Sequence, residues 1–427
     1  MRVLAGAAVV FALLAIAALL IRVANSVRGT PVEEVVGGAE PLRTSSPDFA
    51  YRASFLSETA LLGGNRIEIL EDAHVFDRMI PDHAAARSSV TFLGYYCGVG
   101  TLADRIVEVL EERARAGVKV LFLGDGFGCR HLLDEIRAPL IAAGAQVASF
   151  RPLRWYWFDR AQHRMHARSV VIDGRVGYTG GFGIDDKWTV AAPGEPMWQD
   201  VGVRFMGPAV LQMQATFLAA WAEATGALVS DETFLPGPPD VPEGEVQAGL
   251  LYSSPGIGPT TAERHLAVTI SAAERTLYVA NSYFIPTGPV RRLLADAARR
   301  GVDVRLLVPD EHTDIPIARF AGRGFYEELL ESGVKVYEYQ PAMMHAKTMV
   351  ADGVWSAIGS VNMDNRSIRL NDESALLVFD RGVGARMDSL FLSDLQSAQE
   401  ITLESHRRRP LPERIFEVLT RLVAPLL

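Results

Sequence analysis

The chain has 427 residues, of which 49% are hydrophobic and 22% charged, so it can bury a large core and is long enough for two domains. Its net charge of −9 argues against broad electrostatic capture of nucleic acid, which requires lysine and arginine to neutralise phosphates. Two cysteines, Cys97 and Cys129, are too few for a disulfide framework, and their spacing matches no common metal motif. We expect each of them to be a buried or inert thiol.

The N-terminal stretch from Val3 to Ile21 is apolar and uncharged, with arginines on both sides. It is long enough to cross the core of a bilayer as one helix. A cleaved signal peptide is the alternative, but its apolar core would be shorter and would precede a small-residue cleavage site. We therefore expect an uncleaved membrane anchor. The flanking positive charges nearly balance, so the sequence leaves its orientation open.

A proline-rich run divides the rest of the chain, because proline at that density cannot continue a helix or an interior strand. The expected segments are a membrane anchor (1–24), a linker (25–63), a first domain (64–234), the junction (235–245), a second domain (246–405) and a C-terminal basic and amphipathic helix (406–427).

Each half contains one copy of a short pattern, H-x-(K/R)-x4-D. The copies are His166-Ala167-Arg168 with Asp173, and His345-Ala346-Lys347 with Asp352. A single string of this kind is weak evidence, since its residue types are common on surfaces, but two copies need a shared origin. The apolar residues inside each copy, 169–172 and 348–351, predict short strands, which place the histidine and the cation on one face of a sheet.

The similarity between the halves extends beyond these motifs. Matching pairs of segments are 114–120 with 298–304, 143–147 with 332–336, and Gly180-Gly181-Phe182-Gly183 with Gly359-Ser360-Val361-Asn362. In the upstream pairs a helix end leads into an apolar strand. The chain is therefore an internal duplication of an α/β unit.

With these motifs the chain resembles the phospholipase D superfamily and, within it, the bacterial cardiolipin synthases. The likeness runs from about Gly64 to the C-terminus and includes Trp198-Gln199-Asp200 and the stretch from Asn362 to Glu373. It implies an α/β fold of two pseudo-twofold related α/β/α sandwich domains with mixed sheets, preceded by an N-terminal transmembrane helix. It also implies that no metal and no cofactor take part.

The resemblance assigns the two histidines to a two-step phosphoryl transfer. His166 would attack the phosphodiester phosphorus to give a phosphohistidine, and His345 would protonate the departing alcohol and later deprotonate the incoming one. The sequence leaves the opposite assignment open.

Four further residues are expected around the phosphate, where charge develops in the transition state: Arg168, Lys347, Ser360 and Asn362. The first half departs from the family here. Arg168 stands where the pattern has lysine, and Gly183 stands where the first copy usually carries asparagine. We interpret these changes as an altered phosphate cradle, because arginine is a planar, bidentate donor and the glycine lacks an amide.

The carboxylates have two expected roles. The resemblance makes the motif aspartates structural supports that face away from the phosphate. Separate carboxylates should orient the histidines through their other ring nitrogens, as in catalytic triads. We expect Glu373 to orient His345 and Asp200 to orient His166. A solvated strand end is the alternative for these carboxylates.

Thirteen residues separate Pro152 from His166, against three between Pro341 and His345, and this longer segment carries four consecutive aromatic residues, 155–158. Such a cluster belongs to a core in an arbitrary sequence, but beside a lipid-cleaving site it suits a membrane contact or an acyl-chain wall. His163 in the same segment receives no role.

Near the C-terminus, Ile415, Phe416, Leu419 and Leu422 form one helical stripe after a basic cluster. We expect this stripe to dock on the core, although a basic cluster beside an apolar stripe also suits an anionic bilayer.

Three functions compete. The first is phosphatidyl transfer by a cardiolipin synthase, in which two phosphatidylglycerol molecules give cardiolipin and glycerol. The second is hydrolysis by a phospholipase D or a nuclease, and the third is a non-catalytic membrane protein. The anchor and the acidic balance argue against a nuclease, and the intact motifs argue against the third. We therefore expect an enzyme of the bacterial inner membrane that binds phospholipid and no nucleic acid; oligomeric state and sidedness stay open.

Overall fold

The computed structural model describes Ile16, Leu19, and residues 29–37, 41–153, 162–189, 196–237, 242–422 and 424–426. The stretch expected to form the anchor therefore lies almost wholly outside the described residues, as do the aromatic residues 155–158 and part of the junction. Among the described residues, no helix is long and apolar enough to cross a membrane.

The first half of the chain alternates strands and helices up to β4 and then forms antiparallel strands. Its elements are β1 (Leu62–Glu71), α3 (His74–Ala84), β2 (Ser89–Gly94), α4 (Thr101–Arg115), β3 (Lys119–Asp125), α5 (Arg130–Ala142), β4 (Gln146–Phe150), β5 (Ser169–Ile172), β6 (Val176–Gly180), β7 (Val201–Met206) and α7 (Pro208–Thr225).

The second half repeats this order and adds elements at its end. They are β8 (Val246–Ser253), α8 (Thr261–Ala272), β9 (Thr276–Asn281), α9 (Gly288–Arg299), β10 (Asp303–Pro309), α10 (Pro316–Arg323), α11 (Tyr326–Glu331), β11 (Lys335–Tyr339), β12 (Lys347–Ala351), β13 (Trp355–Gly359), α12 (Asn365–Arg369), β14 (Glu373–Phe379), α13 (Arg381–Leu395), β15 (Ala398–Ile401), α14 (Leu403–Arg407) and α15 (Leu411–Arg421).

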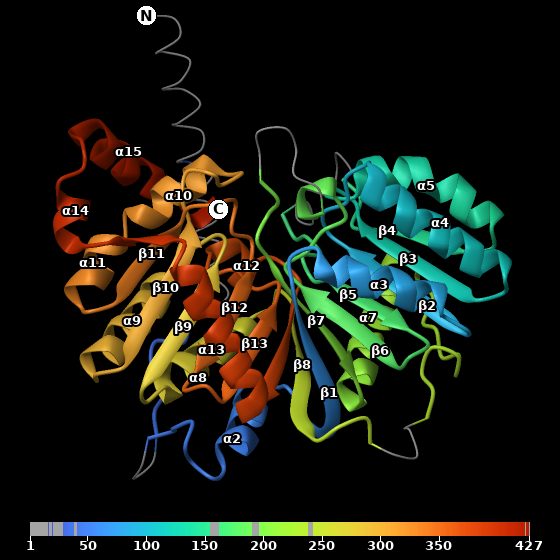
Figure 1. Ribbon diagram of the computed structural model, residues 1–427, viewed down its shortest axis with the longest axis horizontal. Coiled ribbons are helices and arrows are strands. Elements are labelled where there is room, and N and C mark those ends of the chain that lie inside the picture. The colour runs from blue at the N-terminus through green and yellow to red at the C-terminus, as the bar shows by residue number, and fades with distance from the viewer. Residues whose placement is uncertain are drawn as a thin grey trace, which may run out of the picture.

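All of these strands belong to one mixed sheet that reads the same outward from its centre. The order is β15-β11-β10-β9-β12-β13-β14-β8-β1-β7-β6-β5-β2-β3-β4, with β8 and β1 antiparallel neighbours at the middle. In Figure 1 the two halves of the sheet lie side by side about this β8–β1 seam. Each half pairs its second strand in parallel with its third, and antiparallel with the strand that follows its histidine motif. The strand order thus preserves the duplication.

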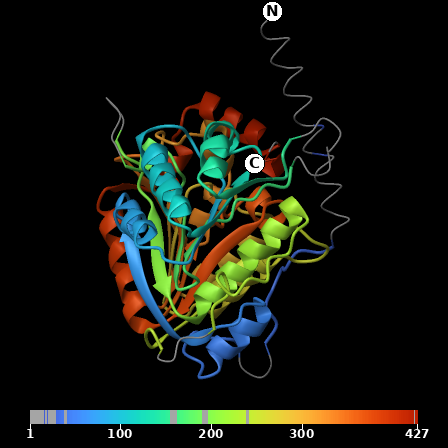
Figure 2. The ribbon, with the colours of Figure 1, turned by 90° about the vertical axis from the view of Figure 1, so that its right-hand side faces the viewer.

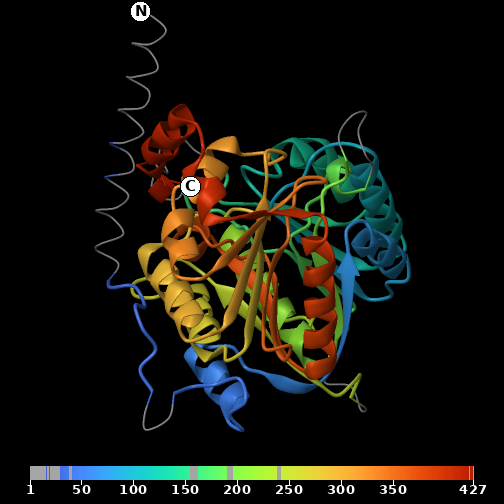
Figure 3. The ribbon, with the colours of Figure 1, turned by 60° about the vertical axis from the view of Figure 1, so that its left-hand side comes forward.

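Helices cover both faces of the sheet, as Figures 2 and 3 show from two sides. Alternate residues of β3 separate these faces: Phe122 packs in one apolar cluster with α4 and α5, whereas Leu123 packs in another with α7. The alternation follows from the period of two along a strand. The fold is therefore a three-layered α/β structure.

The segment interpreted as a linker is folded in part. It contains α2 (Phe49–Leu56), and the fully buried Phe49 packs edge-to-face on Trp355 with ring centroids 5.3 Å apart. This part of the chain therefore belongs to the core of the second half, although it precedes the first half in sequence.

The docking predicted for the C-terminal stripe is wrong for most of its described residues. Ile415, Leu419 and Leu422 are exposed, and α15 contacts the rest of the protein through the buried Glu417 and Thr420. Only Phe416 makes an apolar contact of the expected kind, edge-to-face with Phe320 of α10. Glu417 takes the inner position because Arg409 and Arg323 pair with it.

Candidate active site

The two histidines meet because each half of the chain reaches across to the other just before its motif strand. Isolated parallel bridges join Met165 to Asp372 and Gln199 to Met344. His345 donates its backbone N–H to the carbonyl of Gln199 at 2.7 Å. These crossings bring the residues that precede β5 and β12 to the seam between the halves.

The crossing also exchanges the carboxylates that orient the histidines. Glu373 accepts the Nδ1–H of His166, with both Oε atoms 2.9 Å from that nitrogen. Asp200 Oδ2 lies 3.0 Å from Nδ1 of His345. The predicted pairing of Glu373 with His345 and of Asp200 with His166 is therefore wrong, whereas the choice of these two carboxylates is right. Glu373 is the first residue of β14 and Asp200 directly precedes β7; each follows a residue that bridges to the opposite half just before its histidine motif.

The motif aspartates lie at the far ends of their strands and support loops there. Asp173 accepts the backbone N–H groups of Arg87, Ser88 and Ser89 at 2.7 to 3.1 Å. Asp352 accepts those of residues 274–276 at 2.7 to 2.9 Å. The predicted supporting role agrees with these contacts, and neither aspartate belongs with the reacting groups.

The two motif cations are buried beside the histidines but are held differently. Arg168 donates Nε to the carbonyl of Phe182 at 3.1 Å and Nη1 to the carbonyl of His166. Its Nη2 is buried and has no hydrogen-bond partner among the described residues. Lys347 Nζ lies 2.9 Å from both ring nitrogens of His345 and donates to that residue's carbonyl. An unpartnered buried guanidinium nitrogen is costly, so Arg168 is suited to bind an anion.

Ser360 and Asn362, the predicted phosphate ligands of the second half, occupy different positions. Ser360 is fully buried and donates its hydroxyl to Glu373, so it fits support of that carboxylate better than phosphate contact. Asn362 lines the cavity described below, and its Oδ1 accepts a hydrogen bond from Ser282 at 2.9 Å. This leaves the amide NH2 of Asn362 as the donor end.

Steric contacts explain why the first half has glycine at positions 181 and 183, where the second half has serine and asparagine. A Cβ on Gly181, the counterpart of Ser360, would lie 2.3 Å from Oδ1 of Asp200. A Cβ on Gly183, the counterpart of Asn362, would lie 2.8 Å from the carbonyl oxygen of Tyr96 and 3.0 Å from the ring of Trp188. Trp188 Nε1 instead donates to Asp200 at 2.8 Å, and its ring packs edge-to-face on His345. The indole thus replaces the serine hydroxyl as the donor to the carboxylate.

Burial controls the charge of these groups. It lowers the pKa of His166 and of His345 well below the usual value, and the neighbouring Arg168 and Lys347 add to the effect. Burial likewise lowers the pKa of Lys347 to about 7 and raises the pKa of Glu373 to about 7. Both imidazoles are therefore neutral near pH 7. When Nδ1–H of His166 is donated to Glu373, its Nε2 carries the lone pair, whereas Nε2 of His345 lies 2.9 Å from Lys347 Nζ.

A single cavity of about 560 Å³ opens onto both histidines. Its polar lining includes Arg168, Asn362 and Arg366. The rest of its wall is largely aromatic and apolar and includes Tyr95, Tyr96, Phe127, Leu153, Trp188, Trp198, Tyr283, Ile285 and Ile315. The cavity thus combines an anion-binding floor with a wall suited to an amphipathic molecule.

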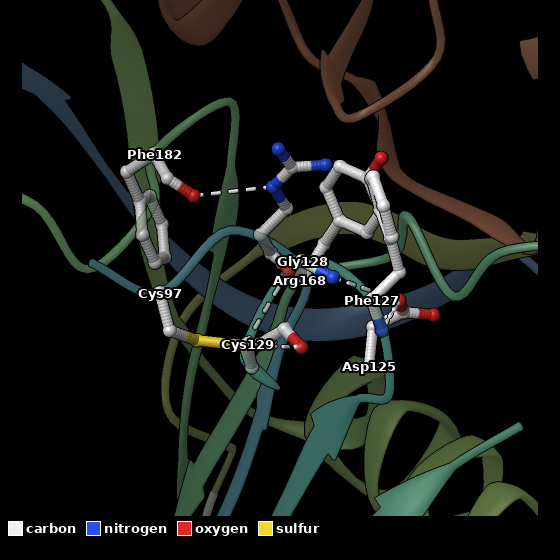
Figure 4. The surroundings of a disulfide bond; sticks show 9 residues. Cys97, Asp125, Phe127, Gly128, Cys129, Arg168 and Phe182 are labelled. Carbon is white, nitrogen blue, oxygen red and sulfur yellow. Dashed lines mark hydrogen bonds between the residues drawn. A yellow bond between two sulfur atoms is a disulfide. The ribbon is translucent and has the colours of Figure 1, made fainter. Parts of the chain in front are cut away.

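The two cysteines form a disulfide, so the prediction of inert thiols is wrong. The bond joins the loop after β2 to the loop after β3, and both loops contribute to the cavity wall through Tyr95 and Phe127. Figure 4 shows Phe127, Gly128 and Arg168 around the bond. A count of two cysteines excludes a framework of several bridges but not one bridge, whose partners here are 32 residues apart.

Several cavity residues carried no signal that we used. Tyr95 packs edge-to-face on His166 at 4.7 Å between ring centroids, and Tyr283 and Trp198 pack on His345. Ser367 donates its hydroxyl to Glu373. Trp198 and Ser367 had a detectable signal, since they lie in Trp198-Gln199-Asp200 and in the stretch from Asn362 to Glu373.

Sequence comparisons agree with the site. The family model described as "Cardiolipin synthase, PLD-like domain" matches residues 266–395. A cardiolipin synthase of Geobacillus kaustophilus is 35% identical over 384 residues, which cover 88% of this chain and 75% of that protein. One of Listeria monocytogenes is 30% identical over 382 residues, which cover 89% and 79%.

Solved structures with low sequence identity share the fold. A phosphatidylserine synthase of Haemophilus influenzae superposes with a TM-score of 0.65 at 15% identity, covering 88% of this chain and 99% of that chain. A polyphosphate kinase of Porphyromonas gingivalis gives a TM-score of 0.52 at 13% identity, covering 90% and 56%. Together with the paired motifs and the identity to curated relatives, these findings mean that the chain belongs to the cardiolipin synthase family of the phospholipase D superfamily.

Proposed function

We propose that this enzyme is a phosphatidyltransferase that converts two phosphatidylglycerol molecules into cardiolipin and glycerol. One observation carries the proposal: a single cavity with an amphipathic wall holds two neutral histidines, each bound to a buried carboxylate, next to an unpartnered guanidinium nitrogen of Arg168. The family relationship supports the same reaction.

In the first step, Nε2 of His166 attacks the phosphorus of one phosphatidylglycerol. A P–N bond forms, the bond from phosphorus to the headgroup glycerol oxygen breaks, and His345 supplies the proton that this oxygen needs. Glu373 stabilises the positive charge that develops on the His166 ring. Arg168 and Lys347 bind the non-bridging oxygens of the substrate phosphate. The negative charge of these oxygens raises the pKa of His345, so that His345 carries a proton when substrate is bound.

In the second step, the primary hydroxyl of a second phosphatidylglycerol gives its proton to His345 and attacks phosphorus. The P–N bond breaks, His166 is regenerated as a neutral imidazole, and cardiolipin leaves. Water would give phosphatidic acid at this point. The aromatic wall formed by Tyr95, Trp188 and Tyr283 favours the lipid alcohol because it excludes water from the phosphohistidine.

The test uses the purified full-length chain in phosphatidylglycerol vesicles. The expected products are cardiolipin and glycerol in equal amounts by mass spectrometry, and His166→Ala and His345→Ala should each abolish both. Phosphatidic acid without cardiolipin would reassign the enzyme as a hydrolase. No lipid turnover would contradict the catalytic proposal.

The localisation that we propose is the bacterial inner membrane, with residues 1–24 as a single anchor and the two halves as pseudo-twofold related catalytic domains. The disulfide supports placing the catalytic part on the oxidising side of that membrane, because disulfides persist in such compartments and are rare in the cytosol.

A further inference from the structure

The C-terminal helix α15 turns its polar side toward the protein and its apolar side toward the solvent, which is the reverse of an ordinary surface helix. Its buried side carries Glu417, which is 3% exposed, and Thr420, which is fully buried. Its outward side carries Leu411, Ile415, Val418, Leu419 and Leu422, which are 40% to 65% exposed. These five residues follow helical spacing and form one continuous stripe, called the α15 stripe below.

Ion pairs keep the polar side of α15 inward. Arg409 binds Glu417 through Nε at 3.0 Å, and Arg323 of α10 lies 3.5 Å from the same carboxylate. Both arginine side chains are largely buried. Turning the helix over would separate them from Glu417 and leave that ion pair broken, which is costly for buried charges. The outward direction of the stripe is therefore a built feature of the fold.

A water-exposed stripe of five large apolar side chains is unusual for a surface without a partner. Arg414 and Arg421 are exposed on or at the end of the helix, and Arg408 next to it is exposed and paired with Glu404. Apolar side chains with flanking arginines match the boundary region of a bilayer that contains anionic lipid.

One groove connects the α15 stripe with the segment that follows the expected anchor and with the active-site cavity. Gly29, the first residue described after the expected anchor, lines the same groove as Val418 and Leu422. That groove also shares Ile285 with the active-site cavity. In Figure 1, α15 and α10 lie next to each other at one edge of the molecule.

We propose that the α15 stripe inserts into the headgroup and acyl boundary of an anionic bilayer and holds the mouth of the active-site cavity against the membrane. Ile315 at the start of α10, together with Phe127 and Leu153, gives the cavity an exposed apolar rim for contact with the same bilayer surface. The lipid can then enter the site without leaving the bilayer surface.

The experiment uses the full-length chain with one reporter cysteine. Both native cysteines are engaged in the disulfide, so Val418→Cys provides a unique thiol for an environment-sensitive fluorophore. Glu404→Cys on the neighbouring α14, at an exposed polar position, is the matched control. In vesicles with one third phosphatidylglycerol, we expect quenching by lipids spin-labelled near the headgroup at 418 and not at 404.

Equal quenching at both positions, or none at 418, would overturn the proposal. Crosslinking of the 418 thiol to residues 3–21 or to a second copy, without lipid quenching, would assign the stripe to the anchor or to a dimer instead. Since this readout needs no catalysis, it is independent of the proposed reaction.

A second variant tests the functional part. Val418→Glu with Leu422→Glu changes only exposed positions, so the fold should persist. We expect KM for vesicular phosphatidylglycerol to rise about tenfold, while turnover of a short-chain, detergent-dispersed analogue stays within twofold. Equal losses on both substrates would contradict a membrane role.

Discussion

In both half-sites a carboxylate binds Nδ1 of the histidine, but different side chains donate hydrogen bonds to the two carboxylates. In the second half, Ser360 and Ser367 donate hydroxyls to Glu373. In the first half, glycines take the serine and asparagine positions, and the indole of Trp188 donates to Asp200. Each histidine thus keeps a carboxylate 2.9 to 3.0 Å from its Nδ1, whereas the donors around that carboxylate have diverged.

The crossed carboxylates explain why both halves are needed. His166 depends on Glu373 from the second half, and His345 depends on Asp200 from the first. Neither half contains a complete histidine and carboxylate pair. A substitution in one half should therefore change the chemistry of the histidine in the other.

The largest effect is expected at the orienting carboxylates. Glu373→Gln and Asp200→Asn keep the shape of each side chain but remove the charge that stabilises the imidazolium, as in catalytic triads. We expect kcat for cardiolipin formation to fall about 10³-fold or more in each variant, measured from product by mass spectrometry. A loss of less than tenfold in either variant would separate that carboxylate from the reaction.

Arg168 is the point at which the first half departs most clearly from its family. If its buried Nη2 binds a phosphate oxygen, Arg168→Ala should lower kcat/KM by about 10²-fold, because a charge-assisted hydrogen bond in the transition state is lost. Arg168→Lys should retain more activity than Arg168→Ala. Equal activity of the wild type and both variants would remove Arg168 from the site.

Lys347, the cation of the second motif, should make kcat/KM depend on pH. Burial lowers the pKa of Lys347 to about 7, so the free enzyme loses this charge as the pH rises through that value, and kcat/KM should fall. Burial raises the pKa of Glu373 to about 7 and that of Asp200 to about 6, so protonation of these carboxylates, and not of the histidines with their lowered pKa, should set the acidic limb. Lys347→Arg keeps the charge at all accessible pH values.

The matching measurement is kcat/KM between about pH 5 and pH 9. In Lys347→Arg the alkaline limb should move upward by at least about one pH unit, since the guanidinium does not deprotonate in this range. An unchanged alkaline limb would show that another group causes it.

The smallest effect is expected at the disulfide, which joins two loops of the cavity wall. Cys97→Ala with Cys129→Ala, or reduction of the wild type, should lower kcat/KM about tenfold, because a displaced wall misplaces the lipid. Reductant should have no further effect on the double variant, which serves as the control. Protein taken from cells should resist alkylation until it is reduced; free thiols would contradict the oxidising location.

The sequence predicted the motif strands, the duplication and the residues of the site, because periodic patterns and repeated strings are local signals. The sequence did not predict contacts between residues that are distant in the chain. The partners of His166 and His345 depend on bridges across the seam, and the partner of Cys97 depends on adjacent loops. In the sequence Gly183 indicates a lost amide, but a Cβ at this position would lie 2.8 Å from the carbonyl oxygen of Tyr96, which belongs to the loop after β2 and is distant in sequence.

The crossed pairing of the histidines is the central claim, and imidazole NMR titration tests it most directly. In the full-length chain with labelled histidines, Glu373→Gln should shift the Nδ1 resonance and the pKa of His166 and leave those of His345 nearly unchanged. Asp200→Asn should do the reverse. If Glu373→Gln instead perturbed His345 alone, each half would orient its own histidine, and the crossed arrangement would be wrong.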